Sequence, residues 1–155
     1  MSGQDVGFFD VGTDCLDIVI ENGDLKADNG LDTAAFISLF SDRRVTLEEL
    51  PAGEDDRKGW WADLISEPID DEIGSKLWTL ERSKINNATA AELETILEEA
   101  FKWMLDDGIS NSVVVTAEQV GINEIRGSVE ISKPDGSSHP FKFIWDGQRL
   151  KISEV

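Results

Sequence analysis

The stretch that decides the fold is Ala88-Thr-Ala-Ala-Glu-Leu-Glu-Thr-Ile-Leu-Glu-Glu-Ala-Phe-Lys-Trp-Met-Leu-Asp106. Its apolar side chains recur at the spacing that places them on one face of an α-helix. That apolar stripe consists of Leu93, Ile96, Leu97, Ala100, Phe101 and Met104. We therefore predict a long helix over Ala88–Asp106 whose apolar face is covered by another layer of structure.

The residues after Gly108 follow a different pattern. Three segments rich in β-branched and aromatic residues cover Val113–Val120, Ile125–Ile131 and Phe141–Trp145, and turn-forming residues separate them. Such segments are typical of strands. We predict a three-stranded antiparallel meander packed on the long helix. A short fourth strand over Leu150–Ile152 is compatible with the sequence but is not part of this prediction.

The residues before the long helix predict smaller elements. Cys15–Ile20 and Leu25–Ala27 flank the turn signal Asn22-Gly23-Asp24 and predict an N-terminal β-hairpin. Helical spacing predicts a helix over Leu31–Ser41, and Ser75 is placed to cap another over Lys76–Ile85.

Together these elements predict an α+β fold: an N-terminal hairpin, two to three helices and the C-terminal meander. The chain of 155 residues suits a single domain. Residues 1–14 are rich in Gly and Asp and predict a flexible N-terminal arm, which leaves residues 15–155 as the domain.

The charge of the chain is strongly negative and unevenly distributed. Of the net −18, residues 1–107 contribute 26 acids and 9 bases, and residues 108–155 contribute 6 acids and 5 bases. Nucleic-acid and anionic-membrane binding both need basic surfaces. The composition therefore argues against nucleic acid and membrane as partners and favours basic protein surfaces.

Residues for catalysis or metal binding are scarce. Cys15 is the only cysteine and His139 the only histidine; we interpret Cys15 as a buried or half-buried strand residue and His139 as a surface turn residue. The runs Asp55-Asp56 and Asp70-Asp71-Glu72 lack the pattern of a calcium loop, so we interpret them as solvated loop charge. Glycine-rich phosphate loops are absent. We expect no catalytic residues, metal or cofactor.

Aromatic and basic residues cluster instead between Ile37 and Trp78. Arg43 and Arg44 follow the first predicted helix, Trp60 and Trp61 are adjacent, and Trp78 lies shortly after. Trp and Arg are enriched at the energetic centres of protein interfaces. If the chain is extended there, one of Trp60 and Trp61 points into the core and the other outward; alternatively both pack in the core. The arginines either complement the helix dipole, pair with the acidic loops or contact a partner.

The order of short segments resembles the Mu-type phage tail and baseplate family, the gene product forty-six family of contractile-tailed phages and prophages. The match extends from about residue 17 to residue 145, and the segments that carry it are Asp17-Ile-Val-Ile20, Leu39-Phe-Ser-Asp42-Arg43-Arg44, Arg57-Lys-Gly59-Trp60-Trp61-Ala-Asp63, Gly74-Ser-Lys-Leu-Trp78, Leu80-Glu-Arg-Ser-Lys84 and Trp103-Met-Leu-Asp-Asp-Gly108.

The resemblance implies a structural, non-enzymatic baseplate component related to wedge and sheath-initiator proteins. The implied partners are other baseplate wedge proteins and the tail sheath protein, with sixfold repetition in the baseplate and a monomer or weak oligomer in isolation. It also implies a place in the virion tail baseplate, after assembly in the bacterial host cytoplasm. On this basis we expect Arg43, Arg44, Trp60, Trp61 and Trp78 to form or brace a protein-interaction surface.

Two other functions are compatible with the composition. The net charge also suits an acidic inhibitor that mimics DNA, although a mimic should spread carboxylates over one continuous face. The abundant acids also leave open a carboxylate-dependent cell-wall hydrolase, whose paired carboxylates need a defined separation and one raised pKa.

Overall fold

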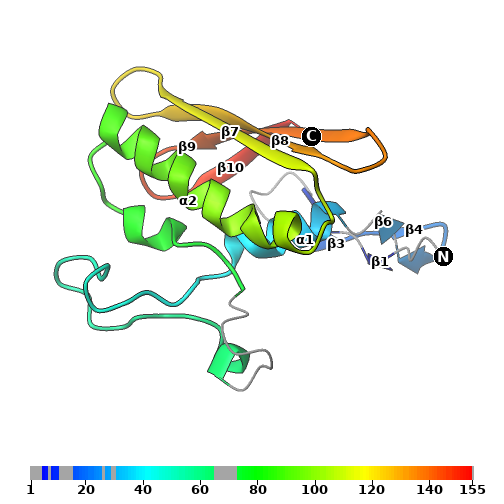
Figure 1. Ribbon diagram of the computed structural model, residues 1–155, viewed down its shortest axis with the longest axis horizontal. Helices are drawn as coiled ribbons and strands as arrows, with labels where there is room; N and C mark the ends of the chain where they lie inside the picture. Colours follow the sequence, from blue (N-terminus) through cyan, green and yellow to red (C-terminus); the bar gives the residue numbers. More distant parts are fainter. Residues whose placement is uncertain are drawn as a thin grey trace.

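The computed structural model describes the backbone of residues 5–6, 8–10, 16–25, 27–28, 31–64 and 73–154. A sheet of four strands forms one layer, α2 lies against it, and α1 packs beside α2 (Figure 1). The helices are α1 (Leu31–Phe40) and α2 (Asn87–Asp106), and the short 3₁₀ helices are η1 (Trp61–Leu64) and η2 (Leu77–Leu80). Within these ranges, no helix combines the length and apolar character that a membrane span needs.

The four-stranded sheet is an antiparallel meander in the order β10-β9-β8-β7. Its strands are β7 (Ser112–Gln119), β8 (Ile125–Ser132), β9 (Ser138–Trp145) and β10 (Leu150–Glu154). The predicted meander is confirmed, but its count of three strands is wrong. Asp146 accepts hydrogen bonds from the backbone amides of Gln148 (3.0 Å) and Arg149 (2.8 Å), and this side-chain turn returns the chain as β10.

The core lies between α2 and the inner face of this sheet. The helix buries the predicted stripe, and the Phe101 and Phe141 rings meet edge-on with centroids 6.1 Å apart. The opposing buried residues of the sheet are Val115, Ile125, Val129, Ile131, Phe141, Phe143, Trp145 and Leu150. Alternate side chains on β7 are exposed, including Val114. This two-sided pattern is expected of an antiparallel sheet with one covered face.

The N-terminal strands differ from the predicted hairpin. They are β1 (Asp5–Val6), β2 (Phe8–Asp10), β3 (Leu16–Ile18), β4 (Ile20–Glu21), β5 (Asp24–Leu25) and β6 (Ala27–Asp28). The predicted hairpin of residues 15–20 with 25–27 is wrong because β3 pairs with β2, and β6 pairs with β1. Around the predicted turn at Asn22-Gly23, the short strands β4 and β5 form an antiparallel pair.

Two further predictions concern the regions beside these elements. The helix predicted over Lys76–Ile85 is wrong: only η2 forms, because Arg82 adopts a positive φ of 68° and its amide bonds to the carbonyl of Gly147. The expected flexible arm of residues 1–14 contains β1 and β2, and its remaining residues, with Cys15, lie outside the described ones. The boundary at residue 14 stays a prediction.

Gly127 on β8 is required by the packing of the sheet. A Cβ atom at this position would overlap the Phe143 ring and the carbonyl oxygen of Thr116. We predict that Gly127→Ala lowers the free energy of unfolding by about 1–3 kcal/mol, the usual cost of overpacking. Chemical denaturation measures this change, with Glu130→Ala on the exposed side of the same strand as the control. Equal stabilities of the two variants would contradict the packing described.

Candidate protein-interaction surface

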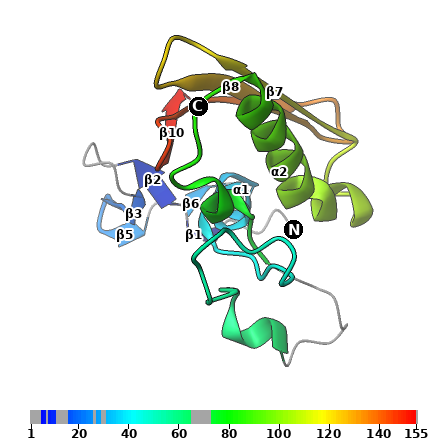
Figure 2. The same ribbon diagram turned by 90° about the vertical axis from the view of Figure 1, so that its left-hand side faces the viewer.

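A long loop between α1 and η1 carries most of the predicted interaction residues. In both ribbon views this loop and η1 lie on the side of the molecule away from the sheet (Figures 1 and 2). The outgoing and returning segments are held together where Val45 donates its amide to the carbonyl of Arg57 (3.2 Å), and the Arg57 Nε donates to the carbonyl of Val45 (2.5 Å). Residues 46–56 of this loop are exposed, apart from half-buried Leu50 and Pro51.

Ser75 fixes the start of this loop to the body of the protein. Its amide donates to the carbonyl of Ser41 (2.9 Å), and its hydroxyl donates to the carbonyl of Leu39 (2.7 Å). In return, its carbonyl accepts the amide of Arg43 at 2.9 Å. Ser75 is only 2% exposed, so these bonds are shielded from water. The end of α1 and the segment before η2 are thereby joined.

Trp78 lies beneath the loop and is buried. Its indole Nε1 donates to the carbonyl of Arg43 at 2.9 Å. The Lys58 ammonium lies 4.8 Å from the centroid of the Trp78 ring and 3.0 Å from the Asp42 carboxylate. Trp78 therefore braces the loop from inside, and its side chain is not available as a contact residue.

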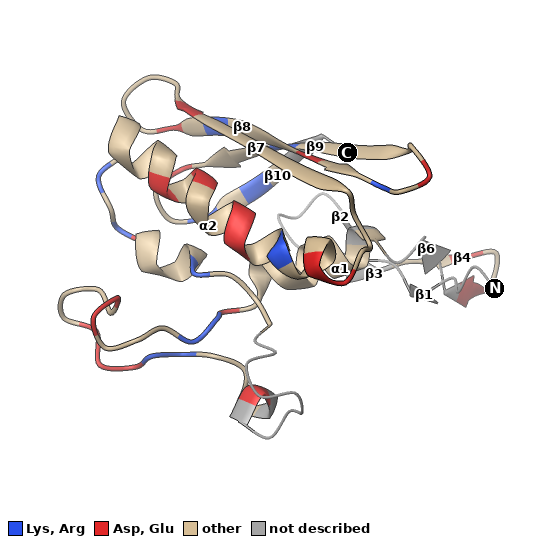
Figure 3. Ribbon diagram, viewed as in Figure 1, with Lys and Arg blue, Asp and Glu red and all other residues tan. Residues whose placement is uncertain are grey.

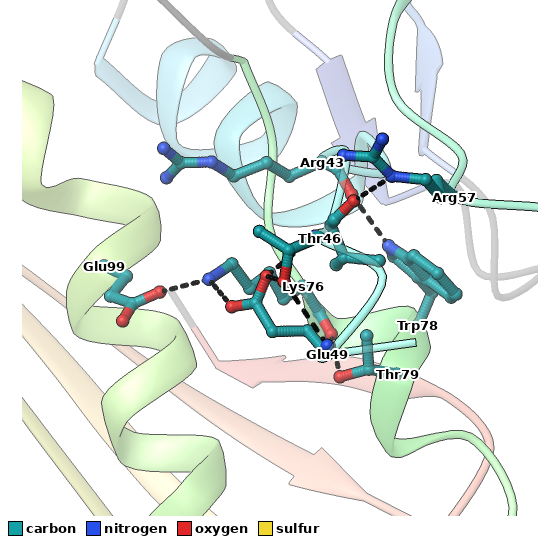
Figure 4. A network of polar contacts seen from close by, with 9 residues as sticks. Arg43, Thr46, Glu49, Arg57, Lys76, Trp78, Thr79 and Glu99 are labelled. Carbon is teal, nitrogen blue, oxygen red and sulfur yellow. Dashed lines mark hydrogen bonds and ion pairs between the residues drawn. The ribbon is translucent and has the colours of Figure 1, made fainter. Parts of the chain in front are cut away.

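Lys76 connects the loop to α2. Its ammonium lies 2.5 Å from the Glu49 carboxylate in the loop and 3.4 Å from the Glu99 carboxylate on α2 (Figure 4). The hydrogen bond from Lys76, together with those from the amide and hydroxyl of Thr46, lowers the pKa of Glu49 from 4.5 to about 2. Partial burial would lower the pKa of Lys76, but the hydrogen bond to Glu49 and the field of Glu99 raise it.

The contacts of Lys76 with Glu49 and Glu99, here called the clamp, predict a pH dependence of the loop. Because the pKa of Glu49 is depressed in the folded protein, the clamp stabilises the fold above about pH 4.5 and is lost as the pH falls through about 2. The Thr46 amide, 2.9 Å from the Glu49 carboxylate, should report this step in an NMR titration. Lys76→Met should move the midpoint up toward the ordinary value of a glutamate.

Lys84→Met is the matched control, because it removes the same charge from an exposed lysine outside the clamp. It should leave the midpoint of the Thr46 amide unchanged. A wild-type midpoint near 4.5, or equal midpoints for the two lysine variants, would show that Lys76 does not hold Glu49.

Trp60 and Trp61 are both exposed, at 45% and 69% of their surface. Their ring centroids lie 5.8 Å apart with an interplanar angle of 55°. The alternative with one tryptophan in the core and the alternative with both in the core are therefore wrong. The physical reason is that the chain enters η1 at Trp61 instead of continuing extended, on a loop held away from the core.

The two arginines lie at the base of the same loop and are half-buried. Arg44 donates from Nη1 to the carbonyl of Lys58 at 3.3 Å. Gly59, at φ +100°, packs against Arg44 so closely that an added Cβ would lie 2.6 Å from the Cβ of Arg44. The returning chain can pass Arg44 only with glycine at this position. Arg44 therefore helps to position the segment that leads directly into Trp60.

The structure thus divides the predicted site residues into two groups. Arg43, Arg44 and Trp78 meet at the base of the loop, whereas Trp60 and Trp61 face solvent. The contributions of Lys76, Glu49 and Lys58 were not predicted, because no local sequence pattern marks contacts between segments so far apart. Ser75 was expected to cap a helix, and its hydroxyl does accept the amide of Leu77 at 3.3 Å, but its stronger bond links two distant segments.

Of the residues considered for catalysis or metal binding, the structure describes Asp55, Asp56 and His139. Among the described residues, no group of three or more His, Cys, Asp or Glu side chains could hold a metal ion. His139 was expected in a surface turn, but it is half-buried in β9 opposite Ile131. The Asp70-Asp71-Glu72 run lies outside the described residues.

Comparison with known proteins decides the family. The family model described as "Phage protein GP46" matches residues 31–138, which include α1, the loop, α2 and the strands β7 and β8 of the sheet. The chain belongs to the phage protein GP46 family. It is similar to the baseplate protein gp46 of Escherichia phage Mu, with 38% identity over 82% of this chain and 86% of the Mu protein. It is also similar to the Mu-like prophage FluMu protein gp46 of Haemophilus influenzae, with 32% identity over 82% of this chain and 86% of that protein.

The family match covers every predicted interaction residue. Arg43, Arg44, Trp60, Trp61 and Trp78 all lie between residues 31 and 138, so the loop and its anchors belong to the part shared with the GP46 family. The resemblance inferred from the sequence is confirmed at the level of the family. The strands β1 to β6 and β10, and all of β9 except Ser138, lie outside the matched range.

Proposed function

We propose that this GP46-family chain is a structural part of a phage or prophage contractile-tail baseplate, and that it acts by protein–protein assembly without catalysis. The observation that carries the proposal is the 38% identity to the baseplate protein gp46 of phage Mu over 82% of the chain. In this role the chain is a wedge component related to sheath initiators. Its partners are other wedge proteins and the tail sheath protein, in a sixfold-repeated arrangement.

The exposed tryptophan pair supports assembly as the mode of action. Large aromatic side chains exposed side by side are costly in water and are favoured at the centres of interfaces. The loop that presents Trp60 and Trp61 is held by Ser75, Trp78 and Lys76 before any partner arrives. A surface that is already ordered loses less conformational entropy on binding.

The tryptophan pair gives a direct test of this surface. We predict that Trp60→Ala combined with Trp61→Ala leaves the thermal unfolding temperature within a few degrees of wild type, because both side chains are exposed. The same variant should fail to enter tails, as measured by quantitative mass spectrometry of purified particles. Ile122→Ala, which truncates an apolar side chain that is 85% exposed between β7 and β8, is the control and should be incorporated normally. Normal incorporation of the double variant would refute the role of the pair.

For the contact with the sheath protein we propose β10 as the donor edge, to which a strand of the sheath protein is added. The sheet has its two edges at β7 and β10. On β7 the outward amide of Ala117 already donates to the Glu94 carboxylate of α2 at 2.5 Å. This bond makes that amide unavailable to an added strand at the β7 edge. The segment 108–155 has 6 acids and 5 bases, so its charge opposes pairing less than the rest of the chain does.

The pairing pattern indicates which amides of β10 face outward. Asp146 donates its amide to the carbonyl of Arg149, so alternation along the β9–β10 ladder directs the amide of Ile152 away from β9. Proline lacks this amide, yet it is tolerated at an edge whose N–H faces solvent. Replacing Ile152 by proline therefore removes an outward-facing donor that an added strand would use.

We predict that Ile152→Pro yields baseplates without attached sheath. Ile152→Ala is the matched control, because it loses the same apolar side chain and keeps the amide, and it should assemble sheath normally. Electron microscopy of tails from both variants measures the difference. Sheathed tails with the proline variant would exclude strand addition at β10, and sheath loss with the alanine variant as well would trace the effect to packing.

A further inference from the structure

A half-open pocket of about 310 Å³ lies between α1 and the C-terminal part of α2. It is separate from the loop surface and from the β10 edge. Its walls are mostly apolar and include Ala34, Ile37, Ser38, Ile73, Trp103 and Asp107. Ile37 is 43% exposed at its rim. The size suits one or two side chains inserted from outside.

The polar groups in the wall already have partners. Trp103 donates its indole Nε1 hydrogen to the hydroxyl oxygen of Ser38 at 2.9 Å, and this hydroxyl donates to the carbonyl of Ala34 at 2.9 Å. A polar ligand would therefore find neither of these groups free, and it would lose hydrogen bonds to water on entry. The pocket favours an apolar group that packs on the indole ring of Trp103.

The rim of the pocket is acidic where a helix prefers cations. Asp107 is the C-cap residue of α2, next to Asp106, and helix C-termini favour positive charge. The Lys102 ammonium lies 3.8 Å from the Asp106 carboxylate, whereas no basic side chain in the described part of the chain forms an ion pair with Asp107. Figure 3 shows that acidic residues also lie along α2 toward this end. A cationic group from outside would complement both the carboxylate and the dipole.

These observations select one kind of occupant. A second copy of the chain is disfavoured because each copy carries a net charge of −18. We propose that the pocket between α1 and α2 binds a segment of another tail protein that inserts an apolar side chain beside Trp103 and places an adjacent Lys or Arg against Asp107. The inference rests on the proposed function, because it takes the partner from the same particle.

Site-specific photo-crosslinking in assembled tails tests this proposal. A benzoylphenylalanine replaces Ile37 at the rim, and a control replaces Thr95, which is exposed on another face of α2. After irradiation, mass spectrometry identifies the attached peptide. We expect position 37 to link to another tail protein, at a peptide in which an apolar residue adjoins Lys or Arg. Links only to this chain, to a second copy or to an acidic peptide, or the same links from both positions, would overturn the proposal.

A charge-reversal variant separates binding from folding. Asp107→Lys should keep or raise thermal stability, because it places a cation at the helix C-terminus. It should nevertheless lower the yield of the crosslink from position 37 by roughly tenfold, since like charges now face each other. An unchanged yield would overturn the proposal, as would a folded position-37 variant that enters tails without any crosslink.

The proposed function is tested separately by the unaltered chain. If wild-type protein is absent from purified tails, the baseplate role fails and this inference fails with it. If wild-type protein is present and the crosslinks contradict the expectation, only the assignment of the pocket fails.

Discussion

The apolar stripe of α2 must be covered, and the inner face of the β7–β10 sheet is the surface that covers it. Phe101 of the helix meets Phe141 of the sheet, and Gly127 leaves room for the Phe143 ring. This packing gives the molecule a rigid body, because the largest buried side chains belong to the two facing layers and their neighbours. The loop between α1 and η1 is attached to that body through contacts with α2 and η2.

The loop between α1 and η1 depends on this body for its shape. Lys76 joins Glu49 of the loop to Glu99 of α2, and the indole N–H of Trp78 in η2 donates to the carbonyl of Arg43 in the loop. Exposed ion pairs of this kind contribute little to stability individually. Their value here is positional, since they order a segment whose exposed end carries Trp60 and Trp61. An ordered aromatic pair on an otherwise acidic chain is suited to assembly rather than to chemistry.

The elements with a clear period were predictable from the sequence. The helix over residues 88–106 and three of the four sheet strands follow from spacing alone. The course of the loop was not predictable, because its contacts join residues far apart in the chain: Lys76 with Glu49, Trp78 with Arg43, and Ser75 with Leu39. The exposure of both tryptophans was missed for the same reason, since alternation applies only while the chain is extended. The family was predictable because several short segments occur in the family's order, although no single residue or segment is diagnostic.

Cryo-electron microscopy of purified tails can locate this chain and show what its tryptophan pair contacts. We expect density for this α+β fold in the baseplate, repeated around the sixfold axis, with Trp60 and Trp61 buried against a neighbouring protein. Tails that lack the chain, or a baseplate in which both tryptophans face solvent, would show that the proposed assembly role is wrong.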